Sequence, residues 1–166
     1  EHQRLSLIKE SETKQTVVFA DLANDFYQLT EPPLTDEERA LLLQLEKDLT
    51  EHQEIAKDKI ELYAHIQKTA NQMKINISEN DERTKLKLRY YLIRDLFNLQ
   101  QIEPLLHDDQ IEKIICEGVE KPVVIIRDGR RWKTNIIFSH QEAINALLEQ
   151  VAKKTYQQLS LEEPIL

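Results

Sequence analysis

The stretch PVVIIRDGRRWKTNIIF, residues 122–138, carries the clearest structural signal in the chain. Two runs rich in Val and Ile flank Asp128-Gly129, a dipeptide that favours a two-residue turn with positive φ at both positions. The stretch therefore predicts a β-hairpin with strands at 122–127 and 131–138. The stretch also contains four cations within a span of seven positions: Arg127, Arg130, Arg131 and Lys133. They could meet a nucleic acid, a nucleotide phosphate, an acidic partner or only water.

Elements on both sides of this hairpin extend it into a small sheet flanked by helices. Upstream, the apolar run at 111–116 predicts a third strand. Downstream, Ser139 and Glu142 form a capping box, which predicts that a helix follows the sheet. Before the sheet, an amphipathic helix is expected to begin at Ser78.

The first half of the chain has a different, mostly helical pattern. Residues 1–15 are polar and charged and are expected to be poorly ordered at the start, and residues 17–29 predict a short hairpin. Thr35 and Glu38 form a capping box, and leucines then recur at helical spacing without any Gly or Pro. Either one long helix or a helix pair that breaks near Thr50 would fit this pattern.

The predicted fold class is α+β, with three segments. Residues 1–77 are expected to form a mostly helical subdomain that contains the short hairpin. Residues 78–160 are expected to form an α+β subdomain with an antiparallel sheet of three strands or more. Residues 161–166 are interpreted as the start of a linker.

Charge argues against nucleic acid as a partner. The 166 residues carry a formal net charge of −8, and residues 1–80 hold 16 acidic against 9 basic side chains. Binding to a phosphate backbone needs clustered Lys and Arg, which this acidic half lacks. The acidic helical segment at 35–75 is instead the expected protein-binding surface, suited to a basic loop of a membrane protein.

The chain carries no catalytic motif of its own. Gly118 and Gly129 are its two glycines, too few for a P-loop or a dinucleotide-binding loop. The 5 histidines are scattered over different elements, so no metal site is assigned. The single cysteine, Cys116, excludes an internal disulfide, and its apolar neighbours predict a buried thiol.

Several pieces of sequence resemble, in the right order, the archaeal secretion ATPases that power type II secretion, type IV pili and the archaellum. The matching pieces are YQLTEPPL at 27–34, YYLIR at 90–94, IEPLLHD at 102–108 with IEKI at 111–114, PVV at 122–124, TNI at 134–136 with Phe138, and SLEEPIL at 160–166.

The resemblance implies that the chain is the N-terminal region of such a protein, before its RecA-like motor domain. ATP and Mg²⁺ would bind the motor of the parent ATPase, and this fragment would hold no cofactor and be inactive alone. The parent would be a hexamer in the cytoplasm at the inner face of the cell membrane. Its N-terminal region would contact its own motor domain, neighbouring subunits and a polytopic platform protein. The alternative is a standalone protein-interaction module.

The same resemblance implies candidate contacts to the nucleotide phosphates. The N-terminal arginines of relatives approach the terminal phosphate when the domain closes on the motor, and Arg has the donor geometry for that task. The candidates here are Arg94, Arg127, Arg130 and Arg131. Ile137 occupies a position where relatives commonly carry arginine, so whether a hairpin arginine replaces that contact stays open. The competing interpretation is a solvated hairpin tip with local ion pairs.

Overall fold

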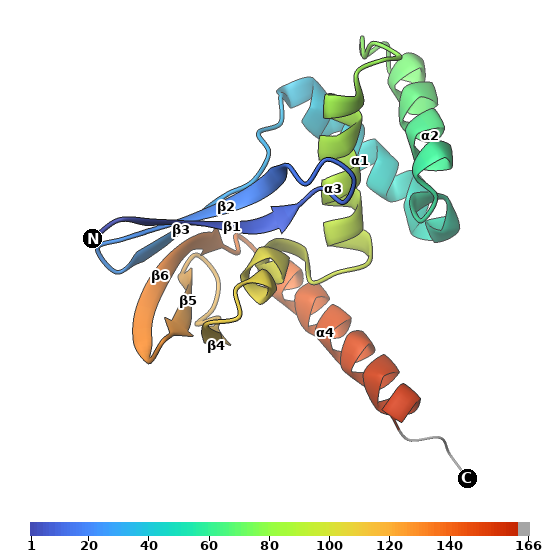
Figure 1. Ribbon diagram of the computed structural model, residues 1–166. Helices are drawn as coiled ribbons and strands as arrows, with labels where there is room; N and C mark the ends of the chain where they lie inside the picture. Colours follow the sequence, from blue (N-terminus) through green and yellow to red (C-terminus); the bar gives the residue numbers. More distant parts are fainter. Residues whose placement is uncertain (163–166) are drawn as a thin grey trace. The chain divides into compact units, whose positions relative to one another are not determined.

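The computed structural model describes residues 1–162, with side chains through residue 156, and its fold is α+β (Figure 1). Its contacts divide the chain into two units. We call residues 1–31 together with those from 101 onward the sheet unit, and residues 32–100 the helical unit. The elements in chain order are β1 (Gln3–Lys9), β2 (Thr16–Ala23), β3 (Phe26–Thr30), α1 (Asp36–Glu51), η1 (Gln53–Ala56), α2 (Lys59–Gln72), α3 (Glu82–Leu96), η2 (Gln100–His107), β4 (Ile111–Ile115), β5 (Pro122–Arg127), β6 (Arg130–Ile137) and α4 (Gln141–Glu162).

The sheet unit is built on one six-stranded sheet with the order β1-β2-β3-β6-β5-β4. Two antiparallel meanders, β1-β2-β3 and β4-β5-β6, meet where β3 runs parallel to β6. At this junction Phe26 pairs with Lys133 and Tyr27 with Thr134. Burial alternates along β3, so that Tyr27 and Leu29 face the interior between exposed neighbours.

This topology corrects the expected subdomain boundary between residues 77 and 78. The N-terminal hairpin does not belong with the helices that follow it, because β3 supplies hydrogen-bonding partners for β6. Without β3, that side of β6 would be an unpaired sheet edge. Most of the expected linker, residues 161–166, lies outside the described part of the chain.

The β2–β3 and β5–β6 turns both use backbone of positive φ. Asp128 has φ 50° and Gly129 φ 71°, which confirms the predicted β5–β6 turn. Asn24 and Asp25, at φ 50° and 63°, make the β2–β3 turn in the same way. Asn and Asp tolerate this region better than other residues with a Cβ, because their short side chains bond locally.

The start of the chain, which was expected to be poorly ordered, enters regular structure at its third residue, because Gln3–Lys9 form β1. This strand pairs with β2 from Gln3–Leu22 to Lys9–Thr16. Its polar side chains are exposed because it is an edge strand, and Leu5, Leu7 and Ile8 are only half-buried. Backbone hydrogen bonds to β2, rather than side-chain burial, therefore order this segment.

The helical unit resolves the alternative left open by the sequence: residues 36–72 form two helices. α1 begins at the Thr35–Glu38 capping box and ends at His52, and a short 3₁₀ turn leads to α2, which Asp58 caps. α3 is capped by Asp81, three residues after the expected Ser78. The shared core consists of leucine, isoleucine and alanine, among them Leu41, Leu45, Leu49, Leu62, Ile66, Leu88 and Leu92.

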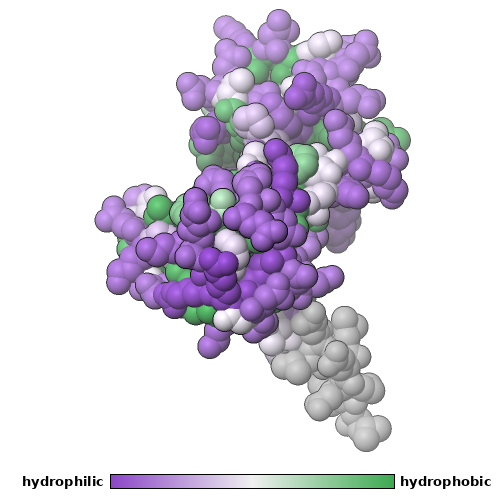
Figure 2. Space-filling view, turned by 60° about the vertical axis from the view of Figure 1, so that its left-hand side comes forward, coloured by the Kyte–Doolittle hydropathy of each residue, from purple (hydrophilic) through white to green (hydrophobic). Residues whose placement is uncertain are grey.

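Hydrophilic residues cover most of the face seen in Figure 2, and hydrophobic residues lie there in small separate groups. Among the described residues, no helix is long and apolar enough to cross a membrane.

Candidate functional site

A buried polar trio ties three separate segments of the sheet unit together. The Tyr27 hydroxyl on β3 donates to Asp108 Oδ2 at 3.0 Å, and Arg127 Nε on β5 donates to the same oxygen at 2.9 Å. Asp108 follows η2, and its other oxygen accepts from the backbone N–H of Gln110 at 3.1 Å. Burial, followed by the Asp108 carboxylate, raises the pKa of the Tyr27 hydroxyl well above its usual range. The trio is thus a closed, fully engaged network.

The trio assigns an internal role to Arg127, one of the four arginines predicted to contact phosphate. Its side chain is only 8% exposed, and that of Asp108 is 5% exposed. A buried ion pair of this kind is costly to break, because the remaining charge would lose its compensation. Arg127 therefore stabilises the fold and is poorly placed to reach a ligand.

The other two hairpin arginines lie at the surface and form exposed ion pairs. Arg131 donates to Glu117 Oε1 at 2.8 Å, with its side chain 55% exposed. Arg130 pairs with Asp25 of the β2–β3 turn, and its guanidinium lies 4.7 Å from the ring centroid of Trp132. Exposed pairs contribute little free energy, about 0–1 kcal/mol. Both cations could therefore exchange their carboxylate for a phosphate at small cost.

Ile137 shares a face of β6 with Arg131 rather than with Arg130. Alternate residues Arg131, Lys133, Asn135 and Ile137 are exposed, whereas Thr134 and Ile136 point to the interior. Arg131 lies six residues from Ile137, or roughly 20 Å along a strand at about 3.3 Å per residue. No hairpin arginine is positioned to take over directly a contact made at position 137.

The fourth predicted arginine, Arg94, belongs to α3 of the helical unit. Its Nε and Nη2 donate to the two carboxylate oxygens of Asp95 at 2.7 and 3.1 Å. The guanidinium also lies 4.8 Å from the ring centroid of Tyr91. Among the described residues, Arg94 is thus a partly buried cation held by two neighbours on its own helix.

A carboxyl pair lies beside this arginine. The Glu46 carboxyl on α1 hydrogen-bonds to Asp95 on α3. Burial, the hydrogen bond to Asp95 and the negative charge of Asp95 raise the pKa of Glu46 to about 7, against the opposing effect of Arg94. Glu46 therefore keeps its proton to a higher pH than an ordinary glutamate.

Thr134 and Asn135, part of the TNI match, connect three strands. The Thr134 hydroxyl donates to the Val123 carbonyl on β5 at 2.7 Å. The Asn135 amide accepts from Leu29 N–H at 2.8 Å and donates to the Leu29 carbonyl at 2.9 Å. This side chain acts as a peptide unit that extends the β3–β6 ladder by one rung. Sequence reasoning used both residues only for the resemblance and missed this role.

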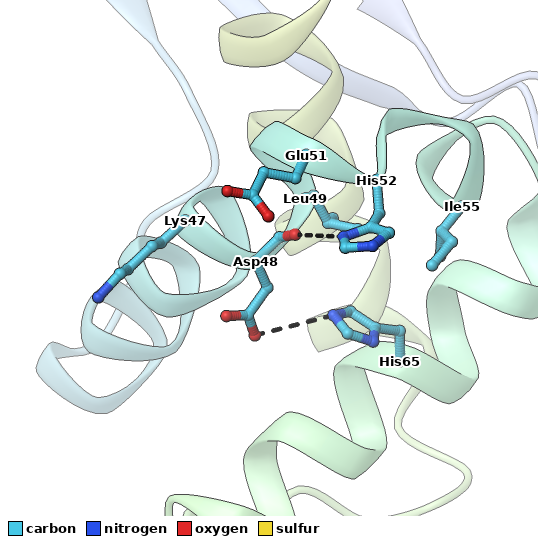
Figure 3. A pocket seen from close by; sticks show the side chains of 7 residues that line it. All are labelled: Lys47, Asp48, Leu49, Glu51, His52, Ile55 and His65. Carbon is cyan, nitrogen blue, oxygen red and sulfur yellow. Dashed lines mark hydrogen bonds and ion pairs between the residues drawn. The ribbon is translucent and has the colours of Figure 1, made fainter.

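A cavity of about 420 Å³ opens between α1 and α2 in the helical unit (Figure 3). We call it the α1–α2 cavity; its lining residues are Lys47, Asp48, Leu49, Glu51, His52, Ile55 and His65. The sequence indicated an acidic binding surface at 35–75 but not this cavity, because the cavity depends on the bend that η1 introduces.

Two histidines meet the backbone and side chain of Asp48 inside the cavity. His52 Nδ1 lies 3.4 Å from the Asp48 carbonyl oxygen, and His65 Nε2 lies 3.9 Å from Asp48 Oδ2 (Figure 3). The second distance is too long for a hydrogen bond. His65 Nε2 is therefore a buried ring nitrogen without a hydrogen-bond partner in the described part of the chain.

Metal ligands and the lone thiol offer no additional site. Residues 1–162 contain no group of three or more His, Cys, Asp or Glu side chains arranged to hold a metal ion. Cys116 is exposed, so the prediction of a buried thiol was wrong. The reason is that β4 ends at Ile115, and the thiol lies in the loop that follows.

Comparison with known proteins finds an archaeal relative of unstated function. None of the protein-family models matches the sequence. The uncharacterized protein MJ1288 of Methanocaldococcus jannaschii is 34% identical to the chain over 147 residues. The match covers 84% of the chain, more than either unit alone, so it includes residues of both units. The chain spans 57% of the relative's length.

Proposed function

We propose that the chain is the N-terminal region of a hexameric secretion or pilus-assembly ATPase, which couples movement of a nucleotide-driven motor to a membrane platform protein. The observation that carries the proposal is the series of matching sequence pieces in the family's order, from YQLTEPPL at 27–34 to SLEEPIL at 160–166. This region would be inactive alone, would hold no cofactor and would act peripherally at the inner face of the membrane. ATP and Mg²⁺ would bind the motor of the parent protein.

The roles of the matching residues support this proposal. Tyr27 and Asp108, from two different pieces, belong to the polar trio. Tyr91, from a third piece, donates its hydroxyl to the carbonyl of Pro32 at 2.6 Å. Asn135, from a fourth, bonds to Leu29 of the first. Pieces far apart in sequence thus meet through specific hydrogen bonds, as expected if they were retained to build one fold.

Arg130 and Arg131 are the proposed phosphate contacts. They are exposed cations in weak ion pairs, whereas Arg127 is committed to Asp108. In a closed motor, the developing negative charge on the γ-phosphoryl group would attract such arginines. This assignment also agrees with the acidic net charge of the chain, which disfavours binding to the phosphate backbone of a nucleic acid.

The proposal is tested first by the sequence that follows Leu166 in the full-length gene. We expect a P-loop, a Walker B motif and the remaining motor motifs there. Their absence would contradict the proposal that the chain belongs to a motor ATPase.

The second test is ATP turnover by the full-length parent with Arg130→Ala and Arg131→Ala combined. Loss of charged hydrogen bonds to the transition state predicts a fall of roughly tenfold or more. Arg83→Ala, an exposed arginine of the helical unit, is the matched control and should retain turnover. Unchanged turnover in the double variant, with an intact fold by circular dichroism, would count against the phosphate role.

A second candidate function, a standalone interaction module, is favoured by the α1–α2 cavity, which lies in the acidic helical segment. It predicts partner binding without any motor domain in the same gene.

A further inference from the structure

The α1–α2 cavity continues along α2 as a longer groove. A second hollow of about 350 Å³ shares Ile55 and His65 with the cavity and extends to Ala64 and Lys68. Apolar side chains of Leu49, Ile55 and Ala64 contribute to its lining. We call the two hollows together the α2 groove. It is large enough for a long side chain and for part of the backbone that carries it.

Acidic side chains give the groove its electrostatic character. Asp48 and Glu51 line one end, whereas Glu61 at the other end is accompanied by Lys68, so the negative charge is concentrated at Asp48 and Glu51. In Figure 3 the amine of Lys47 points away from the two histidines, so it does not neutralise the inner part of the cavity. Residues 36–72 carry nine acidic and five basic side chains. The groove therefore favours a cation over an anion.

Two observations indicate that the occupant is a side chain of another protein. Leu43 and Ile60 are 64% and 81% exposed, and each lies one helical turn from a lining residue, Lys47 and Ala64 respectively. Exposed apolar residues beside a hollow are typical of a protein-binding surface. The buried His65 Nε2 also lacks a hydrogen-bond partner, so the polar groups around the groove are not fully satisfied within the described part of the chain.

We propose that the α2 groove binds an arginine side chain from a basic, partly apolar segment of a partner protein. The guanidinium would bond to the carboxylates of Asp48 and Glu51, its aliphatic stem would pack on the accessible Ile55 and Ala64, and flanking apolar residues of the segment would cover Leu43 and Ile60. An arginine suits this site because it combines a planar fork of donors with an apolar stem. The inference rests on the proposed docking role of the helical unit but not on nucleotide coupling.

The test uses the whole chain and a capped ten-residue peptide that alternates arginine and leucine, with binding measured by isothermal titration calorimetry at physiological salt. Asp48→Asn combined with Glu51→Gln should raise Kd roughly tenfold or more, as expected for loss of charged hydrogen bonds. Asp109→Asn combined with Glu142→Gln makes the same charge change on exposed residues of the sheet unit and should leave Kd unchanged. A peptide with glutamate in place of arginine should not bind.

Chemical-shift mapping by NMR should locate the arginine peptide on His52 and His65. Glu51→Gln alone, at an exposed position, keeps the test valid if the double variant unfolds, and should still weaken binding. Absence of binding to the unmodified chain, equal weakening in the control pair, or shifts confined to the sheet unit would each overturn the inference. If the peptide fails to bind while the parent gene encodes a P-loop, only this inference falls. If it binds and no P-loop follows, the docking site stands without the motor.

Discussion

The interior of the helical unit is built of leucine, isoleucine and alanine, whereas the interior of the sheet unit contains the ion pair between Asp108 and Arg127. The helical unit is one continuous segment, residues 32–100. The sheet unit joins residues 1–31 to residues from 101 onward. The two units therefore differ both in how their chain is assembled and in what fills their cores.

The difference shows where polar groups are useful in a core. Helices that are neighbours in sequence find each other through short connections, and aliphatic packing is enough to hold them. Strands from distant segments must also choose a register, and a slip by one residue would turn every side chain to the wrong face. Buried hydrogen bonds with fixed partners penalise such slips. We infer that the polar trio fixes β3 relative to β5, and that the Asn135–Leu29 bonds fix its register on β6.

Breaking the trio should have the largest effect on stability. Asp108→Ala removes the acceptor of both Tyr27 and Arg127 and leaves the buried Arg127 to its longer, 3.4 Å contact with the exposed Asp128, so the free energy of unfolding should fall by about 3–5 kcal/mol. Urea denaturation measures this change, and hydrogen exchange should report the loss in the strands. The exposed neighbour Asp109→Ala is the control. A loss below about 1 kcal/mol would show that the trio is dispensable.

The aliphatic core should respond to loss of volume rather than of charge. Leu45 is fully buried in α1, and Leu45→Ala should cost about 2–4 kcal/mol through lost transfer energy and the cavity left behind. Leu45→Met, which keeps the volume, should cost less than about 1.5 kcal/mol. Hydrogen exchange should accelerate in residues 32–100 most strongly. Equal losses for the two variants would contradict a core held by packing.

The smallest expected effect concerns the half-buried carboxyl pair of Glu46 and Asp95 in the helical unit. The pKa of Glu46 rises from an ordinary value of 4.5 to about 7, so the folded state binds more protons than the unfolded state between these values. Stability from this group is therefore fully present below pH 4.5 and is lost as pH rises to about 7. Glu46→Gln mimics the protonated form and should flatten this dependence.

Screening by solvent reduces the expected gain of Glu46→Gln to roughly 1 kcal/mol at pH 8, relative to the unmodified chain. Denaturation midpoints at pH 5 and pH 8 provide the measurement.

Two other carboxyls, Glu38 and Asp81, have lowered pKa values and therefore affect stability in the opposite sense. Burial would raise the pKa of Glu38, but hydrogen bonds from Lys87 and Thr35 outweigh it and lower the pKa. The Thr84 backbone hydrogen bond lowers that of Asp81. Their stabilisation is lost only as pH falls below about 4, outside the window tested. If Glu46→Gln keeps the pH profile of the unmodified chain, the raised pKa of Glu46 is refuted.

Local signals in the sequence were enough to predict most elements. Asp128-Gly129 indicated the β5–β6 hairpin, and the Thr35–Glu38 capping box indicated the start of α1, because turn and cap chemistry acts within a few residues. The pairing of β3 with β6 was not predictable from such signals. It depends on Tyr27 meeting Thr134 across more than a hundred residues, which no periodicity encodes.

The candidate sites also divide into features that local sequence patterns predict and features that depend on long-range packing. The sequence identified the exposed cations Arg130 and Arg131 and an acidic surface at 35–75, since charge patterns are visible in composition. It also grouped Arg127 with them, because the sequence does not show whether an arginine at the end of a strand faces solvent or a buried carboxylate such as Asp108. The α1–α2 cavity depends on the angle between two helices, and only the three-dimensional fold contains that information.

The amide of Asn135 has a consequence for the order of folding. Its bonds to Leu29 close a loop of 106 residues that contains the whole helical unit. Loop closure becomes entropically costlier as the loop lengthens, whereas helices form from local contacts. The helical unit is therefore expected to form early and to shorten the flexible chain that separates the two meanders. The seam between β3 and β6 then closes last, with Asn135 as one of its final contacts, and its closure is expected to limit the rate at which the native protein appears.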